Sequence, residues 1–390
     1  MKKIAVVSCY FQKNYGSALQ ALATQKILDE LGVENVTLNY SGIEKQIKKK
    51  KYFFYMKKML SPQVVIGKMG YIKVRLRKKL SKSQLAKNLR LRDASIKKFE
   101  KHFRLSKTFS DFQEISDYVS DFDAVLVGSD QLWLPSNLDA DYYTLNWVPD
   151  KVKRISYATS FGVPEIPKKY YPMAKHFLER IDHLSVREQT GAKIVKDICG
   201  LDAKVICDPT MMLTSQQWMD IQQREPLYKK NKYIFCYFLG DNPEQREFVK
   251  KLKELTGYDI VSILHLNVYV KSDEHYADYT PYDVDSAGFI NYIRNAEYVC
   301  TDSFHASVFS ILYKRKFFTF RRFKASYSLQ TNNRIDTLLD SLSLRDRLLM
   351  NDADPSEYKD KEIDYDSVES KIEGLREINM KFLKNAVDSL

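Results

Sequence analysis

The chain has 390 residues, 44% of them hydrophobic and 29% charged, which is typical of a globular protein with one large domain or two smaller ones. It lacks the run of about 18 apolar residues that a membrane-spanning helix needs, and the apolar stretch after its basic start is too short for a signal peptide. The five cysteines form no CxxC pair, so neither a disulfide framework nor a zinc site is favoured. We expect a cytoplasmic protein, or a peripheral one at the inner face of the membrane.

The net charge of +12 is concentrated in one segment. Residues 45–104 contain 21 Lys/Arg against two acids, Asp93 and Glu100, whereas the rest of the chain contains 41 Lys/Arg and 48 Asp/Glu. The positive charge therefore belongs to an insert and not to the whole chain. We expect this basic insert (residues 45–104) to be helical.

Continuous apolar stretches alternate with helical patterns along the chain, as in sheets that are covered on both faces. Strands are predicted at 4–8, 124–128, 154–158, 183–187 and 204–208, and in a second series at 233–239, 258–264, 297–301 and 316–320. Helices are predicted at 17–31, 167–180, 188–198, 243–255 and 286–295, with a late amphipathic helix at 368–390. This alternation predicts the α/β fold class with mostly parallel sheets.

The segment 208–232 separates the two series of strands, because it has two prolines, a polar run and no strand pattern. We therefore place the domains at 1–215, with the basic insert, and at 216–390, with the helical tail. Two Rossmann-like domains would face each other across a cleft. Ligands would bind there, at the carboxyl ends of the strands.

The first strand is followed by Asn14, Tyr15 and Gly16, which turn the chain into a helix that begins near Ser17. Backbone N–H groups at such a helix start can bind an anion or a sugar hydroxyl. An ordinary N-cap turn explains the same residues. A GxGxxG fingerprint is absent, so a dinucleotide site is not predicted.

Polar residues also end two later strands of the first series. In VGSDQLW, Asp130 and Gln131 stand beside Trp133, a combination that suits a carbohydrate but equally fits a turn above a core tryptophan. In SYATSFG, Ser160 and Gly162 are expected to line the cleft. These side chains are the candidate ligands from the first domain.

Arg187 ends a predicted buried strand in HLSVREQTG and directly precedes a helix. A buried guanidinium needs an anionic partner, because an unpaired buried charge is very unfavourable. Two interpretations stay open. Arg187 forms an internal salt bridge, with Asp182 or Glu188, or it binds the carboxylate or phosphate of a ligand.

His305 is the strongest single candidate for a functional residue. In EYVCTDSFHASVFSIL it occupies the first turn of a predicted helix, with Ser303 as the expected N-cap. A lone histidine beside an apolar run more often belongs to the core, but this one follows a strand, where doubly wound domains bind ligands. His265 is its only rival, since it also follows a predicted strand.

Taken in order, these motifs resemble the polysaccharide pyruvyl transferase family. The resemblance rests on NYGSALQ, VGSDQLW, RISYATSFG, LSVRE, ICDPTMML, FINYIRNAEYVCTDSFHASVFSILYKRKFF and NNRIDTLLDSL, and it covers roughly residues 1–45 and 110–350. Ala306 departs from the family, in which a glycine is commoner at this place, and the basic insert and the tail match nothing in it. The resemblance implies the GT-B architecture of glycosyltransferases, with two facing Rossmann-like domains.

The family's reaction moves the enolpyruvyl group of phosphoenolpyruvate onto two hydroxyls of a sugar in a cell-surface polysaccharide or lipid-linked precursor, which forms a pyruvate ketal and releases phosphate. The resemblance implies that Arg187 and His305 are catalytic and that Arg187, Ser303, His305 and Arg334 bind the donor. His305 would either give the proton that ketal formation requires or only hold the phosphate. A surface capping role is the alternative for Arg334, which begins a predicted helix.

The acceptor sugar would then lie against the first domain. No metal and no cofactor are expected besides the phosphoenolpyruvate substrate. The alternative enzyme is a glycosyltransferase with a nucleotide-sugar donor on the same fold, and a third possibility is a non-catalytic module that binds a membrane or a nucleic acid. The expected acceptor-binding residues are Asn14, Gly16, Ser17, Asp130, Gln131 and Ser160.

The basic insert includes KKKKYFFYMKKML, in which aromatic residues 52–55 stand among lysines. A solvated charged face would carry both signs of charge, and acids are almost absent here. The pattern is typical of a segment that contacts an anionic membrane surface, which would suit a lipid-linked acceptor. Nucleic-acid binding is less favoured, because no recognition motif accompanies the charge.

Overall fold

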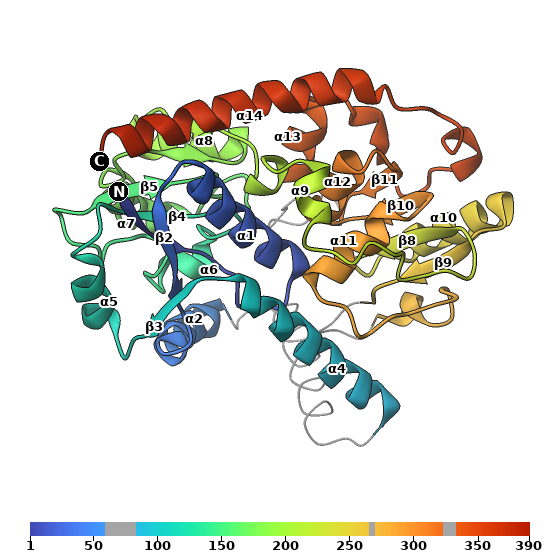
Figure 1. The fold of residues 1–390 in the computed structure, drawn as a ribbon, viewed down its shortest axis with the longest axis horizontal. Helices are drawn as coiled ribbons and strands as arrows, with labels where there is room; N and C mark the ends of the chain where they lie inside the picture. Colours follow the sequence, from blue (N-terminus) through green and yellow to red (C-terminus); the bar gives the residue numbers. More distant parts are fainter. Residues whose placement is uncertain (59–82, 265–269, 323–332) are drawn as a thin grey trace.

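The computed structural model describes residues 1–58, 83–264, 270–322 and 333–390, and it consists of two α/β domains with a parallel sheet each (Figure 1). The first sheet has the order β3-β2-β1-β4-β5, and the second has the order β12-β11-β10-β8-β9. The strands are β1 (Lys3–Val7), β2 (Glu34–Asn39), β3 (Leu105–Thr108), β4 (Ala124–Val127), β5 (Lys153–Ser156), β8 (Tyr233–Tyr237), β9 (Asp259–Ser262), β10 (Tyr298–Thr301), β11 (Lys316–Phe320) and β12 (Leu348–Leu349).

Two short strands extend the first sheet beyond β5. β6 (Ser185–Val186) pairs with β7 (Lys204–Val205), and parallel bridges join Ile155 to His183 and Thr159 to Val186. The predicted strands at 183–187 and 204–208 are therefore present but shorter than expected. All strand pairs in both sheets are parallel, so the predicted α/β class is confirmed.

Helices connect the strands and cover the sheets (Figure 1). Short 3-10 helices lie at Phe99–His102, Lys168–Tyr170, Pro209–Met211, Lys271–Asp273, Arg345–Arg347 and Pro355–Glu357. The α-helices are α1 (Tyr15–Glu30), α2 (Glu44–Lys58), α4 (Gln84–Lys98), α5 (Phe112–Val119), α6 (Pro135–Leu138), α7 (Tyr171–Leu178), α8 (Gln189–Cys199), α9 (Ser215–Met219), α10 (Pro243–Thr256), α11 (Ser286–Arg294), α12 (Phe304–Leu312), α13 (Asn333–Ser341) and α14 (Tyr365–Asp388).

The central strands explain where a ligand can bind. β4, β8 and β10 are buried along their whole length, as their continuous apolar sequences predict. The order of the first sheet reverses between β1 and β4, and that of the second reverses between β8 and β10. In open parallel sheets, ligands bind beyond the carboxyl ends of the strands at such a reversal. The loops that follow these four strands are therefore the expected site.

The tail helix α14 returns to the first domain, over which it runs in Figure 1. The Arg376 guanidinium donates hydrogen bonds to the carbonyls of Met211 and Leu213, at 2.8 and 2.9 Å. Asn379 accepts from the N–H of Cys207 at 3.0 Å and donates to its carbonyl at 2.9 Å. The start of the helix contacts the second domain, where Glu369 pairs with Lys314 at 2.6 Å, so α14 spans both domains. The domain limit at 215/216 stays a prediction.

The basic insert contains helices, as expected, and its helix α4 contacts the second domain. Arg92 is fully buried and donates to the carbonyls of Leu264, at 2.6 Å, and Pro281, at 3.1 Å. Its guanidinium lies 4.6 Å from the ring centroid of Tyr282. Part of the insert therefore joins the two domains. Residues 52–55, on which the predicted membrane contact rests, belong to α2, but the structure does not describe their side chains.

We expect Arg92→Ala to lower the free energy of unfolding by about 1–3 kcal/mol, because it removes two charge-assisted hydrogen bonds between the domains. Amide exchange in residues 278–285 should also become faster. Urea unfolding and hydrogen exchange would measure both effects. Lys97→Ala, at an exposed position of the same helix, is the control, and equal losses in the two variants would contradict a domain-joining role for Arg92.

No helix within the described ranges is both long enough and apolar enough to span a membrane.

Candidate functional site

A cavity of about 240 Å³ lies between the two domains, at the carboxyl ends of their central strands. Most of its lining follows a strand end, as the reversals in strand order predict. Its walls are partly apolar, but several charged and polar side chains converge on it. Those from the first domain are Gln12, Asn14, Lys51, Asp130, Gln131, Ser136 and Asn137, and those from the second are Ser303, His305, Arg322 and Arg334.

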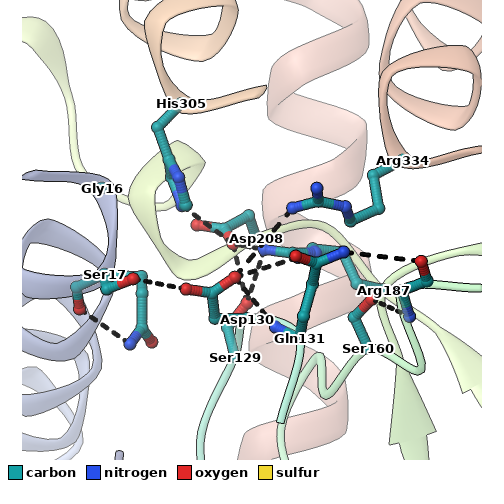
Figure 2. A network of polar contacts seen from close by, with 12 residues as sticks. Gly16, Ser17, Ser129, Asp130, Gln131, Ser160, Arg187, Asp208, His305 and Arg334 are labelled. Atoms are coloured by element: carbon teal, nitrogen blue, oxygen red, sulfur yellow. Dashed lines mark hydrogen bonds and ion pairs between the residues drawn. The ribbon is translucent and has the colours of Figure 1, made fainter. Parts of the chain in front are cut away.

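His305 projects from the first turn of α12 toward the first domain (Figure 2). Ser303 caps the helix, as expected, and its hydroxyl accepts a hydrogen bond from the N–H of Ala306 at 3.5 Å. Nε2 of His305 lies 3.6 Å from Oδ2 of Asp208 and has no hydrogen-bond partner in the described part of the chain. His305 is only 5% exposed but is also among the residues that line the cavity, so its functional role stays a prediction.

The position of His305 explains why residue 16 is a glycine. A methyl group at Gly16 would lie 2.0 Å from Nδ1 of His305, so any larger side chain would collide with the ring. The backbone N–H of Gly16 donates to the side chain of Asn14 at 3.0 Å and is therefore already used as an N-cap contact. Gly16 thus permits the close approach of α1 and α12.

Arg187 is at the centre of a buried ionic network (Figure 2). Its Nη1 lies 2.5 Å from Oδ2 of Asp208, and its Nη2 lies 3.6 Å from Oδ1 of Asp130. Ser129 donates to the same Asp208 oxygen at 2.7 Å. The guanidinium also lies 4.7 Å from the ring centroid of Phe304, in a cation–π arrangement. Arg187 forms an internal salt bridge, but the partners expected for it, Asp182 and Glu188, are wrong.

The network keeps its carboxylates ionised although they are buried. Burial alone would raise the pKa of Asp130, but Arg187, His305, Arg334 and the Ser17 hydrogen bond lower it to about 2. Burial likewise opposes ionisation of Asp208, but His305, Arg187 and Ser129 hold its pKa well below the ordinary value. Asp130 also has a backbone φ of 85°, a strained value for a residue with a side chain, and such strain is found at ligand sites.

Arg334 begins α13 and is only 8% exposed, so the surface capping role is wrong. Its guanidinium lies 5.7 Å from the ring centroid of Phe304, and its Nη1 is 4.0 Å from Oδ1 of Asp130. Burial and the nearby Arg187 lower the pKa of Arg334 to about 9, which still leaves it cationic at neutral pH. Arg334 therefore contributes a second buried cation to the site.

The residues expected to bind the acceptor fall into two groups. Asn14, Asp130 and Gln131 line the cavity, and Gly16 contacts His305. The hydroxyl of Ser17 is buried and donates to Oδ2 of Asp130 at 2.5 Å, and that of Ser160 is buried and donates to Glu188 at 2.8 Å. These two serines are thus bonded to carboxylates, outside the cavity lining.

Sequence reasoning missed Asp208, Lys51 and Arg322. Asp208 is the last residue of a predicted strand and directly precedes a proline, a position comparable with that of Asp130 near a strand end, and this signal could have identified it. Lys51 belongs to a run of four lysines, in which no spacing distinguishes one from another. His265, the rival of His305, lies outside the described residues. Among those described, no group of three or more His, Cys, Asp and Glu side chains could hold a metal ion.

Comparison with solved structures gives the fold. A UDP-N-acetylglucosamine 2-epimerase is 11% identical, with 99% of this chain and 95% of that chain covered and a TM-score of 0.50. The UDP-GlcNAc 2-epimerase from Neisseria meningitidis bound to UDP-GlcNAc is 12% identical, with 98% and 100% covered and a TM-score of 0.48. The first likeness, with the two parallel sheets, confirms the GT-B-like architecture.

No curated protein matches the chain. Comparison with protein families matches residues 14–322 to the family described as "Polysaccharide pyruvyl transferase". The match spans most of both domains and includes Gly16, Asp130, Arg187, Asp208 and His305. The chain therefore belongs to the polysaccharide pyruvyl transferase family.

Proposed function

We propose that this enzyme transfers the enolpyruvyl group of phosphoenolpyruvate to two hydroxyls of one sugar in a cell-surface polysaccharide or its lipid-linked precursor. The product is a pyruvate ketal, and phosphate is released. The observation that carries the proposal is the cavity between the domains, where His305 lies together with the cations Arg322 and Arg334. For a lipid-linked acceptor, the reaction would take place in the cytoplasm at the inner face of the membrane.

The charges of the cavity fit the donor. Phosphoenolpyruvate has a carboxylate and a phosphate, and both are bound well by arginines and by helix N-termini. Arg322 and Arg334 line the second-domain side, next to the N-terminus of α12 at Ser303. This arrangement supports the proposal that these residues and His305 bind the donor.

Arg187 has an indirect role in the proposed reaction. Its charge is engaged by Asp208 and Asp130, and it lies behind the cavity lining. Its Nε and Nη2 atoms have no hydrogen-bond partner among the described residues, so it could donate to an oxyanion that reaches them. Its main effect would be to keep Asp208 ionised beside His305.

His305, Asp208 and Asp130 could together supply the proton transfers that ketal formation requires. A proton from His305 would convert the methylene carbon of the donor to a methyl group, while a sugar hydroxyl adds to the neighbouring carbon. The C–O bond to phosphate then breaks, and the second hydroxyl closes the ketal. One hydroxyl proton restores the acid, and the other leaves with the phosphate, so no further reactant is needed. The ionised Asp208 would stabilise the protonated imidazole, and Asp130 could orient an acceptor hydroxyl.

We expect the purified protein to release phosphate from phosphoenolpyruvate only when a glycan with a suitable diol is present. The new methyl group would be detected by NMR of the product. Sugar transfer from a nucleotide donor, without turnover of phosphoenolpyruvate, would contradict the proposal and support the glycosyltransferase alternative.

A further inference from the structure

Helix α2, in the basic insert, carries a lysine into the cavity. Lys51 lines the cavity together with Asp130 and His305. The three lysines that precede it, at 48–50, are exposed, whereas Lys51 is half-buried. Of these four consecutive lysines, the fold therefore places only Lys51 at the cavity.

Lys51 has no anionic partner among the described residues. Its neighbour Lys48 pairs with Glu44, and Nζ of Lys50 lies 5.0 Å from the ring centroid of Phe112. Nζ of Lys51 lies 6.0 Å from the ring centroid of Tyr143, and no hydrogen bond or ion pair connects it to the described chain. Burial lowers the pKa of Lys51, so the ammonium has lost part of its contact with water.

An ammonium that has lost water without gaining an anion is unfavourable, and such a group is expected where an anion can reach it. Asp130 does not fill this role, because its described ion pairs are with Arg187 and Arg334 and none joins it to Lys51. Arg322 and Arg334 line the same cavity from the second domain. Cations therefore reach the cavity from both domains.

We propose that Lys51 binds an oxyanion of a substrate, a carboxylate or a phosphate, from the first-domain side of the cavity. The identity of the substrate rests on the proposed function. Phosphoenolpyruvate has two such groups, and an acceptor with a phosphate-linked carrier or an acidic sugar has another. Part of the basic insert would then serve substrate recognition in addition to joining the domains.

The test compares Lys51→Gln with Lys50→Gln, which removes an adjacent lysine outside the cavity, and with Lys51→Arg, which keeps the charge. Calorimetry on the full-length chain would give the affinities for phosphoenolpyruvate and for inorganic phosphate, and kinetics would give a KM for each substrate. We expect Lys51→Gln either to lower the affinity for phosphoenolpyruvate or phosphate, or to raise the KM for the glycan, by about 10- to 100-fold, as for loss of a charge-assisted hydrogen bond. Lys50→Gln should match the wild type, and Lys51→Arg should recover most of the loss.

The two sources of the oxyanion give different results. A weaker affinity for phosphoenolpyruvate assigns Lys51 to the donor, and a raised KM for the glycan alone assigns it to the acceptor. The inference is overturned if the wild type turns over phosphoenolpyruvate and Lys51→Gln behaves like Lys50→Gln in every measurement. Binding of inorganic phosphate that depends on Lys51, in a protein that does not turn over phosphoenolpyruvate, would contradict the proposed function and leave the inference standing.

Discussion

His305→Gln is expected to lower kcat for phosphate release by about 10²- to 10⁴-fold, the usual contribution of a positioned general acid. Glutamine keeps a polar group of similar size at this place but cannot supply the proton. Steady-state kinetics would separate the two roles considered for His305. A large loss in kcat identifies the acid, whereas a raised KM for phosphoenolpyruvate with little change in kcat would show that His305 only holds the phosphate. His275→Gln, at an exposed position, is the control.

Gly16→Ala tests the same role without changing the imidazole. The added methyl group would lie 2.0 Å from Nδ1 of His305, so the ring or α1 must move. A displacement of about 1 Å at a reacting group can lower turnover about 10²-fold. Gly374→Ala, on α14, adds a methyl group that meets nothing within 4 Å and serves as the control. Full activity of Gly16→Ala would show that the position of His305 is not critical.

The sequence was informative wherever a local pattern determines the structure. Continuous apolar runs identified β4, β8, β10 and β11, and polar residues at strand ends identified part of the cavity lining, namely Asn14, Asp130, Gln131, Ser303 and His305. β2 (Glu34–Asn39) was missed because its alternating, partly polar residues do not form such a run. β3 and β12 are short edge strands whose pairing depends on β2 and β11, far away in the sequence.

The pairing of charges could not be predicted in the same way. Asp182 and Glu188 are the acids close to Arg187 in sequence, but a salt bridge depends on closeness in space. Asp182 binds Lys153 and the backbone of Arg154 instead, and Glu188 accepts from Ser160. The contacts of α14 with the first domain were unpredictable for the same reason, because they join residues that are far apart in the sequence.

Arg187→Met is expected to lower the free energy of unfolding at neutral pH by about 3–5 kcal/mol, because it leaves the buried carboxylates of Asp208 and Asp130 without their cation. Methionine fills a similar volume, so the effect of an added cavity is small. Urea unfolding would measure the loss. Arg345→Met removes a cation whose side chain is 51% exposed, and a loss below about 1 kcal/mol is expected there. Similar losses in the two variants would contradict a structural role for the buried network.

The pH dependence distinguishes a charge effect from a packing effect. In the wild type, the pKa of Asp130 is about 2, below the value of roughly 3.9 in an unfolded chain, so its stabilisation is present at neutral pH and lost as the pH falls toward 2. Without Arg187, burial would raise the pKa of both carboxyls, and the folded variant would take up protons before the unfolded chain does. The loss in the free energy of unfolding of Arg187→Met relative to the wild type should therefore become smaller as the pH falls from 7 to 4. A loss caused by altered packing would stay constant. A constant deficit would mean that the two carboxylates do not depend on Arg187, and the ionised Asp208 beside His305 would then need another cause.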